Sequence, residues 1–133
     1  MNTDRALIIC DEEENRQKVI AAVLKCGLSP ICCSSLEEAR TLLFQGSFKV
    51  VLCGDILSDG DFRSALKEVK KSTAHTPLIV LSHISEWQAY LNALGAGAFD
   101  YIVCPPEAAE TERILWCALS GTMYPSKAVH ATA

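Results

Sequence analysis

Residues 50–61 of the chain read Val50-Val51-Leu52-Cys53-Gly54-Asp55-Ile56-Leu57-Ser58-Asp59-Gly60-Asp61. The first four side chains are apolar without a break, which is typical of a strand buried on both faces of a parallel sheet. The residues that follow include Gly, Asp and Ser, which favour turns. The stretch therefore predicts a buried strand that runs into a loop, with Asp59 in a turn and Asp61 at the start of a helix.

The rest of the chain repeats this alternation of strand and helix. Further apolar runs lie at residues 6–10, 30–33, 78–81 and 101–103. Apolar residues recur at helical spacing after each of the five runs. Five strands alternating with five helices predict a parallel α/β sheet that is covered on both sides.

Local signals predict where several helices begin and end. Ser35 with Glu38, and Ser85 with Gln88, have the spacing of capping boxes at helix starts. Gly27 is expected to end the first helix, because glycine readily adopts the left-handed conformation found there.

Length and charge exclude several classes of protein. The 133 residues suffice for one domain, which we expect at residues 1–121, followed by a flexible C-terminal tail at 122–133. The net charge of -4 and the scattered basic residues argue against nucleic-acid binding. No apolar run approaches the ~20 residues that span a bilayer, and the start of the chain lacks signal-peptide features. We expect a cytoplasmic protein without membrane contact.

The seven cysteines do not indicate a disulfide framework, because their number is odd and most lie inside apolar runs. In a cytosolic chain they are expected to be small buried hydrophobic residues.

The strand ends are where function is expected. In open parallel sheets the functional crevice lies beyond the carboxyl ends of the strands. Those ends carry Cys10-Asp11, Cys53-Gly54, Ser82-His83 and Cys104-Pro105.

Four motifs together resemble one known family. They are the acidic opening at residues 11–16, the loop Leu57-Ser58-Asp59-Gly60, the Gly-Ala-Gly-Ala turn at residues 95–98, and Pro105 after the fifth strand. From about Arg5 to Ser120 the chain resembles the receiver domain of bacterial two-component response regulators. The resemblance implies a flavodoxin-like doubly wound five-stranded sheet with strand order 2-1-3-4-5. It also implies a role in two-component or phosphorelay signal transduction.

Three positions agree with the functional pattern of that family. Two acidic residues after strand one help to hold Mg²⁺, and Asp11 matches the second of them. A Ser or Thr after strand four contacts the phosphoryl group, and Ser82 matches it. An aromatic residue on strand five moves on activation, and Tyr101 matches it.

Three other positions depart from the pattern. Cys10 stands where the first acid would be, Gly54 where the phosphate-accepting Asp would be, and Cys104 where a Lys precedes the proline. Phosphoryl transfer needs a carboxylate nucleophile and cations at the receiving oxygens. With Asp11 as the one expected carboxylate, any Mg²⁺ site would be weak, and no other cofactor is expected. The sequence therefore predicts a degenerate pseudo-receiver, not an enzyme, that acts through protein contacts.

Asp55 offers an alternative phosphoacceptor, used with Mg²⁺, because it lies one position after Gly54. Side chains alternate between the two faces of a strand, so we expect Asp55 to point away from the pocket, as a solvated loop residue.

A thiol or metal sensor is a further alternative. Cys10 and Cys104 should approach the same pocket, and Asp11 with His83 could complete four ligands for Zn²⁺. The interpretation without a functional site is that the two thiols are buried packing residues and that His83 is an exposed loop residue. Ser82 and His83 are not expected to form a nucleophile-base pair, because adjacent strand-end residues point in different directions.

A partner surface is predicted from aromatic residues in the fourth helix and fifth strand. Trp87, Tyr90 and Tyr101 belong to the face that the resembled family uses for partners and dimers. If exposed, they and Trp116 would anchor a protein partner or a second copy of the chain. Trp87 could equally be a core residue. Without an output domain in these residues, the chain acts by binding a partner or is part of a longer protein.

Overall fold

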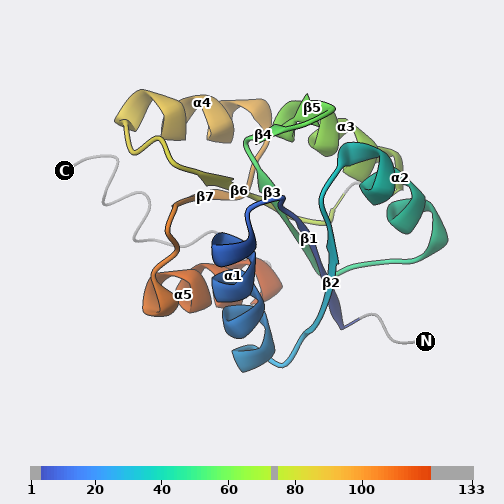
Figure 1. Ribbon diagram of the computed structural model, residues 1–133, viewed down its shortest axis with the longest axis horizontal. Helices are drawn as coiled ribbons and strands as arrows, with labels where there is room; N and C mark the ends of the chain where they lie inside the picture. Colours follow the sequence, from blue (N-terminus) through green and yellow to red (C-terminus); the bar gives the residue numbers. More distant parts are fainter. Residues whose placement is uncertain (1–3, 73–74, 121–133) are drawn as a thin grey trace.

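Five parallel strands form the central sheet of the computed structural model, which describes residues 4–72 and 75–120. The strands are β1 (Arg5–Ile9), β2 (Ser29–Cys33), β3 (Val50–Gly54), β6 (Leu78–Ser82) and β7 (Asp100–Val103). Their order across the sheet is β2-β1-β3-β6-β7, as Figure 1 shows. The predicted flavodoxin-like order is confirmed. The predicted domain end at residue 121 and the tail at 122–133 lie outside the described residues.

Five helices cover both faces of the sheet. They are α1 (Glu13–Lys25), α2 (Leu36–Gln45), α3 (Phe62–Ser72), α4 (Trp87–Ala96) and α5 (Ala108–Ser120). Helices α1 and α5 lie on one face, and α2, α3 and α4 lie on the other (Figure 1). Within the described residues, every helix falls short of the length and apolarity that a bilayer-spanning segment needs.

Alternating strand residues build two separate cores. In β1, Ile8 packs in the cluster beneath α1 and α5, whereas Leu7 and Ile9 pack in the cluster on the opposite face. All three side chains are fully buried. Because both faces are apolar, polar groups of the sheet are confined to the strand ends, where the loops begin.

A short hairpin that the sequence did not predict follows β3. Its strands β4 (Ile56–Leu57) and β5 (Gly60–Asp61) pair antiparallel. Asp61 caps α3 through the backbone N–H groups of Arg63 and Ser64, as expected. Asp59 lies in the turn, as expected, but its carboxylate also contacts another element. It accepts hydrogen bonds from the first two backbone N–H groups of α2.

One of the two predicted capping boxes forms. The Ser35 hydroxyl accepts from the Glu38 N–H at 3.2 Å, and the Glu38 carboxylate returns to the N–H of Ser34 at 2.9 Å. The prediction for Ser85 was wrong. Helix α4 begins one residue later than that box requires, with Glu86 as N-cap and no side-chain cap bond.

This difference predicts unequal effects of removing the two serine hydroxyls. Ser35→Ala should lower the free energy of unfolding by about 1 kcal/mol, because an orphan N–H of α2 loses its partner. Ser85→Ala, the matched control, should change it by less than about 0.5 kcal/mol. Urea denaturation of the three proteins measures both values, and equal losses would contradict the capping assignment.

Candidate functional site

A hollow of about 300 Å³ opens at the carboxyl ends of β1, β3 and β6, in the predicted crevice. Its lining residues are Cys10, Asp11, Glu12, Gly54, Asp55, Ile56, Leu81, His83 and Ile84. Three of the predicted site residues, Ser82, Cys104 and Pro105, are not among them. The hollow is therefore built by the segments after β1, β3 and β6, with little from the end of β7.

Gly54 is the last residue of β3 and lies beside Leu81 of β6. A Cβ atom built on Gly54 would lie 3.7 Å from the Ile56 carbonyl oxygen and 3.8 Å from the Ile9 carbonyl oxygen, which are ordinary contacts. Its φ angle is not in the left-handed region that favours glycine. Neither the packing around a Cβ atom nor the backbone conformation therefore requires glycine at this position.

Asp55 does not point away from the pocket, and this expectation was wrong. Its Oδ2 accepts a hydrogen bond from the Ser82 hydroxyl at 2.6 Å, and the residue lines the hollow. Strand geometry ends at Gly54, and the Asp55 backbone turns to bond Leu81 and Phe62. The alternation of side chains between faces no longer applies beyond that turn. A carboxylate is therefore present in the crevice, one residue later than the family pattern places it.

The Ser82 hydroxyl lies at the centre of a short chain of hydrogen bonds. It donates to Asp55 and accepts from the backbone N–H of Ile84 at 3.0 Å. The Ile84 carbonyl in turn accepts from the Tyr101 hydroxyl at 2.7 Å. Ser82 is buried, and these bonds satisfy it without a contribution from His83. The expectation that Ser82 and His83 do not work as a pair agrees with this geometry.

His83 is exposed, as expected, but it has an acidic partner that the sequence analysis missed. Its Nε2 lies 2.8 and 2.9 Å from the two carboxylate oxygens of Glu12, within hydrogen-bond distance of both. Asn15 also donates to Glu12 at 2.8 Å. The hydrogen bond from His83 holds the pKa of Glu12 below its ordinary value. The only sequence signal for this contact was that both residues follow strands that end at the same edge.

The thiols near the site are buried and unpaired. Cys10 and Cys104 belong to the same apolar cluster as the side chains beneath α1 and α5, and both are free. Burial raises the pKa of the Cys10 thiol, and it raises the pKa of Cys104 to about 11. Burial also raises the pKa of Cys53. Such thiols carry little thiolate at neutral pH and are poor nucleophiles and poor metal ligands.

A metal centre does not assemble from this donor set. Across residues 4–72 and 75–120, no three or more His, Cys, Asp or Glu side chains gather in a way that could hold a metal ion. In the crevice, His83 already occupies the carboxylate of Glu12, and Ser82 occupies one oxygen of Asp55. The residues present therefore do not fit the four-ligand zinc site considered for Cys10 and Cys104.

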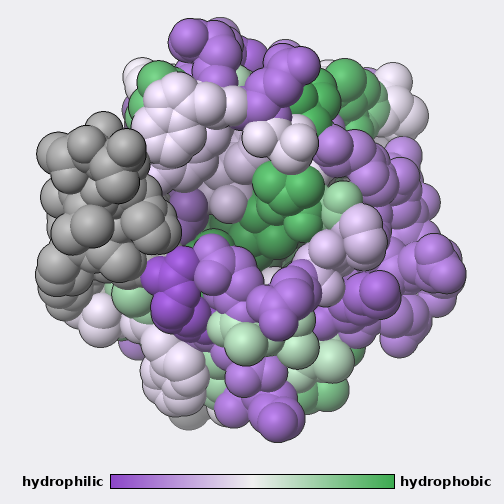
Figure 2. Space-filling model, turned by 90° about the vertical axis from the view of Figure 1, so that its left-hand side faces the viewer, coloured by the Kyte–Doolittle hydropathy of each residue, from purple (hydrophilic) through white to green (hydrophobic). Residues whose placement is uncertain are grey.

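Three aromatic residues form a cluster between α4 and β7. The Trp87 and Tyr90 ring centroids lie 5.1 Å apart, and the Tyr90 and Tyr101 rings meet edge to face at 6.2 Å. Trp87 is 51% exposed, so it is not a core residue. Val103 of β7 is also exposed, and Figure 2 shows apolar surface among polar side chains on this side of the molecule. The predicted partner face is therefore accessible on these elements.

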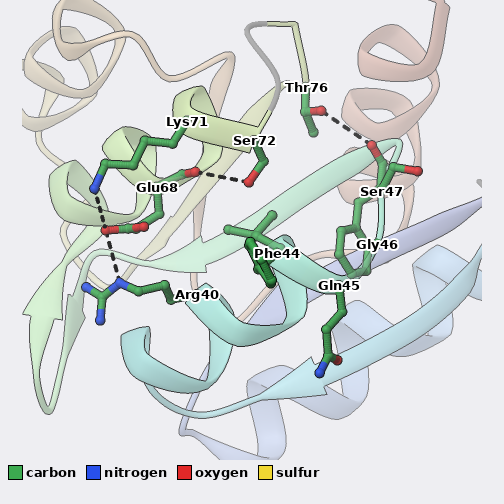
Figure 3. A pocket seen from close by; sticks show the side chains of 11 residues that line it. Arg40, Phe44, Gln45, Gly46, Ser47, Glu68, Lys71, Ser72 and Thr76 are labelled. Atoms are coloured by element: carbon green, nitrogen blue, oxygen red, sulfur yellow. Dashed lines mark hydrogen bonds and ion pairs between the residues drawn. The ribbon is translucent and has the colours of Figure 1, made fainter.

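A second hollow, of about 470 Å³, lies at the opposite end of the sheet between α2 and α3. Figure 3 shows Arg40 and Lys71 directed at the Glu68 carboxylate, at 3.1 and 3.5 Å. These cations are already neutralised, and the strand-end residues lie at the other edge. This hollow is larger than the crevice but holds none of the predicted site residues.

Comparisons with known proteins agree on the type of domain. The chain is 30% identical to the regulatory protein AtoC of Escherichia coli (strain K12) over 116 residues, which is 87% of this chain and 25% of AtoC. It is similar to the crystal structure of a two-component response regulator from Clostridium difficile, with a TM-score of 0.72, 30% identity, and coverage of 84% of this chain and 95% of that one.

A third comparison shows the fold alone. The beryllofluoride-activated NtrC4 receiver domain dimer is 22% identical, with a TM-score of 0.75, and the match covers 89% of this chain and 95% of that one. No protein-family profile matches the chain. The chain spans about a quarter of the length of curated relatives such as AtoC and the PilR protein of Pseudomonas aeruginosa.

The burial of the thiols predicts the pattern of their chemical labelling. In native protein at neutral pH, the exposed Cys32 should react first, and Cys10, Cys53 and Cys104 should react at least about tenfold more slowly. Their labelling should accelerate as the pH rises, because burial raises the pKa values of these thiols. Timed alkylation with peptide mass spectrometry measures the order. Rapid native labelling of Cys10 or Cys104 would favour a thiol sensor.

Proposed function

This chain belongs to the receiver domains of two-component response regulators, and we propose that it is a pseudo-receiver that signals through protein contacts. The observation that carries the proposal is Gly54, which ends the central strand where the resemblance puts the phosphate-accepting Asp. Receiver domains are signalling modules and not classical enzymes. In this one, signalling would not pass through phosphate in the standard way.

The chemistry of phosphoryl transfer supports the proposal at two positions. Gly54 has no side chain with which to attack phosphorus, although the fold leaves room for one. Cys104 is buried and neutral, because burial raises its pKa to about 11, so it supplies no cation for the receiving oxygens. Of the two positions that hold Mg²⁺ in the resembled family, only Asp11 carries an acid, so both electrostatic supports of the reaction would be weakened.

A second candidate is a phospho-switch at Asp55. One observation favours it, since the Asp55 carboxylate lies in the crevice beside Ser82. The hydrogen bond from Ser82 engages Oδ2, and an attack on phosphorus would have to use the other oxygen. Cys104 stands where the family has its Lys, and this departure weighs against the candidate, so we place it second.

The partner in the proposed mechanism is a protein that docks on the α4 and β7 face, or a second copy of the chain. Exposed Trp87 and the half-buried Tyr101 are the residue types that anchor such contacts. We further propose a cytoplasmic location, with no nucleic-acid or membrane contact by this domain. The net charge of -4 supports the absence of nucleic-acid binding.

Acetyl phosphate provides the direct test. Incubated with it and Mg²⁺, the wild-type chain should gain no phosphoryl group in intact-mass spectra. The double variant Gly54→Asp, Cys104→Lys should gain one, because it restores the nucleophile where the structure leaves space and the cation beside it.

The controls separate the two candidates. Gly54→Ala with Cys104→Lys fills the same space without a nucleophile and should remain unmodified. A mass gain in wild-type protein that disappears in Asp55→Ala would overturn the pseudo-receiver and establish the second candidate.

The partner face predicts a selective loss of binding. Trp87→Ala should weaken self-association or partner binding at least about tenfold, because an exposed aromatic anchor is lost. Phe44→Ala is the matched control, since Phe44 is 91% exposed but lies on α2. Sedimentation of the purified chains and affinity capture from native cells measure the two modes. Equal effects of the two substitutions would count against the α4 and β7 face.

A further inference from the structure

A continuous path of contacts joins the crevice to the aromatic cluster. It begins at the Asp55 carboxylate, passes through the Ser82 hydroxyl and both backbone groups of Ile84, and ends on the Tyr101 hydroxyl. We propose that the Asp55 carboxylate takes the place of a phosphoryl oxygen and holds the 83–86 loop and Tyr101 in one fixed arrangement. This inference rests on the proposed phosphate-independent function, and it names the contacts that would hold the partner face in its binding conformation.

The first step depends on the single proton of the Ser82 hydroxyl. A hydroxyl donates one hydrogen bond, and here the donation goes to Asp55 Oδ2 at 2.6 Å. This distance is that of a charge-assisted bond between a hydroxyl and a carboxylate. Ser82 is 1% exposed, so water does not compete for the proton. While Asp55 is in place, Ser82 is directed toward the crevice.

The second step is the attachment of the loop to that hydroxyl. The Ile84 N–H donates to Ser82 Oγ at 3.0 Å, and the Ile84 carbonyl accepts from Tyr101 Oη at 2.7 Å. The N–H of the exposed Ile84 is thus bonded to Ser82, and its carbonyl is bonded to Tyr101. The position of Ile84 fixes the position of the Tyr101 hydroxyl, although the two residues are far apart in the sequence.

The third step carries the arrangement to the surface. The Tyr101 ring meets the Tyr90 ring edge to face, and the Tyr90 ring contacts that of Trp87. Trp87 lies at the first position of α4, directly after the loop. A change at Asp55 would therefore reach the partner face through both the loop backbone and the aromatic rings.

Asp55 is suited to this role because it is fixed by its backbone as well as by Ser82. Its N–H donates to the Leu81 carbonyl at 2.9 Å, and its carbonyl accepts from the Phe62 N–H at 3.1 Å. The carboxylate is therefore a permanent part of the crevice, whereas a phosphoryl group is transient. The consequence is a partner face that is held in one state without a kinase.

Nuclear magnetic resonance of full-length protein with labelled tyrosine rings and backbone amides tests the path. The Tyr101 signal is assigned by Tyr101→Phe. In Asp55→Ala and in Ser82→Ala, the Tyr101 signal should shift in the same direction. In Asp55→Ala, the exchange of the Ile84 amide should accelerate on the order of tenfold. The double variant should shift Tyr101 no further than Ser82→Ala alone, because both residues act in one path.

Two matched variants guard against a merely structural effect. Asp55→Asn keeps an acceptor oxygen and should retain a Tyr101 signal near that of wild type. Asp59→Ala removes a carboxylate of the neighbouring β4–β5 hairpin, one that accepts from the first two backbone N–H groups of α2, and should leave Tyr101 and Ile84 unchanged. Wild-type Tyr101 signal and Ile84 exchange in folded Asp55→Ala would overturn the inference. If Asp55→Ala does not fold, an unshifted Tyr101 in Ser82→Ala would overturn it equally.

The result is separable from the test of the proposed function. The resonance measurements use protein that has not been incubated with a phosphoryl donor, and its intact mass confirms that it carries no phosphoryl group. A mass gain of wild-type protein with acetyl phosphate would refute the phosphate-independent function without altering those measurements. An unshifted Tyr101 in Asp55→Ala would refute the path and leave the phosphate-independent function standing.

Discussion

In an apolar parallel sheet that is covered on both faces, polar side chains can lie only at the ends of the strands. Leu7 and Ile8, adjacent in β1, are fully buried in different cores, and the same alternation runs through β3 and β6. A polar side chain placed within these strands would lose its water without gaining a partner. Charged and hydroxyl groups therefore meet where parallel strands end together, and every contact of the crevice follows from that restriction.

The crevice also shows how a shift of one residue along the chain changes the surroundings of a carboxylate. Gly54 removes a side chain from the last position of β3, and the turn that follows brings the Asp55 carboxylate to Ser82. A carboxylate at residue 54 would extend from strand geometry and meet the open hollow. At residue 55 it accepts a hydrogen bond from the buried Ser82 hydroxyl.

Local patterns in the sequence were reliable wherever a feature depends on neighbouring residues. Uninterrupted apolar runs identified all five strands of the sheet, and Gly27, with a positive φ, follows α1 as expected. The Ser35 cap formed because its partner lies three residues away. The Ser85 box failed although its spacing is the same: α4 begins one residue later, after a loop in which the Ile84 backbone bonds Ser82 and Tyr101.

The sequence by itself determined the strand order, through its resemblance to receiver domains. It also determined that Gly54 and Cys104 supply no carboxylate and no ammonium group, because glycine and cysteine lack these groups in any fold. The tertiary structure alone decided where the remaining groups point. Asp55 meets Ser82 across 27 residues, and Glu12 meets His83 across 71. The side-chain periods of strands and helices, 2 and 3.6 residues, relate only neighbouring residues and cannot predict contacts between residues so far apart in the sequence. These contacts exist because the sheet aligns the ends of distant strands, and that alignment appears only once the chain is folded.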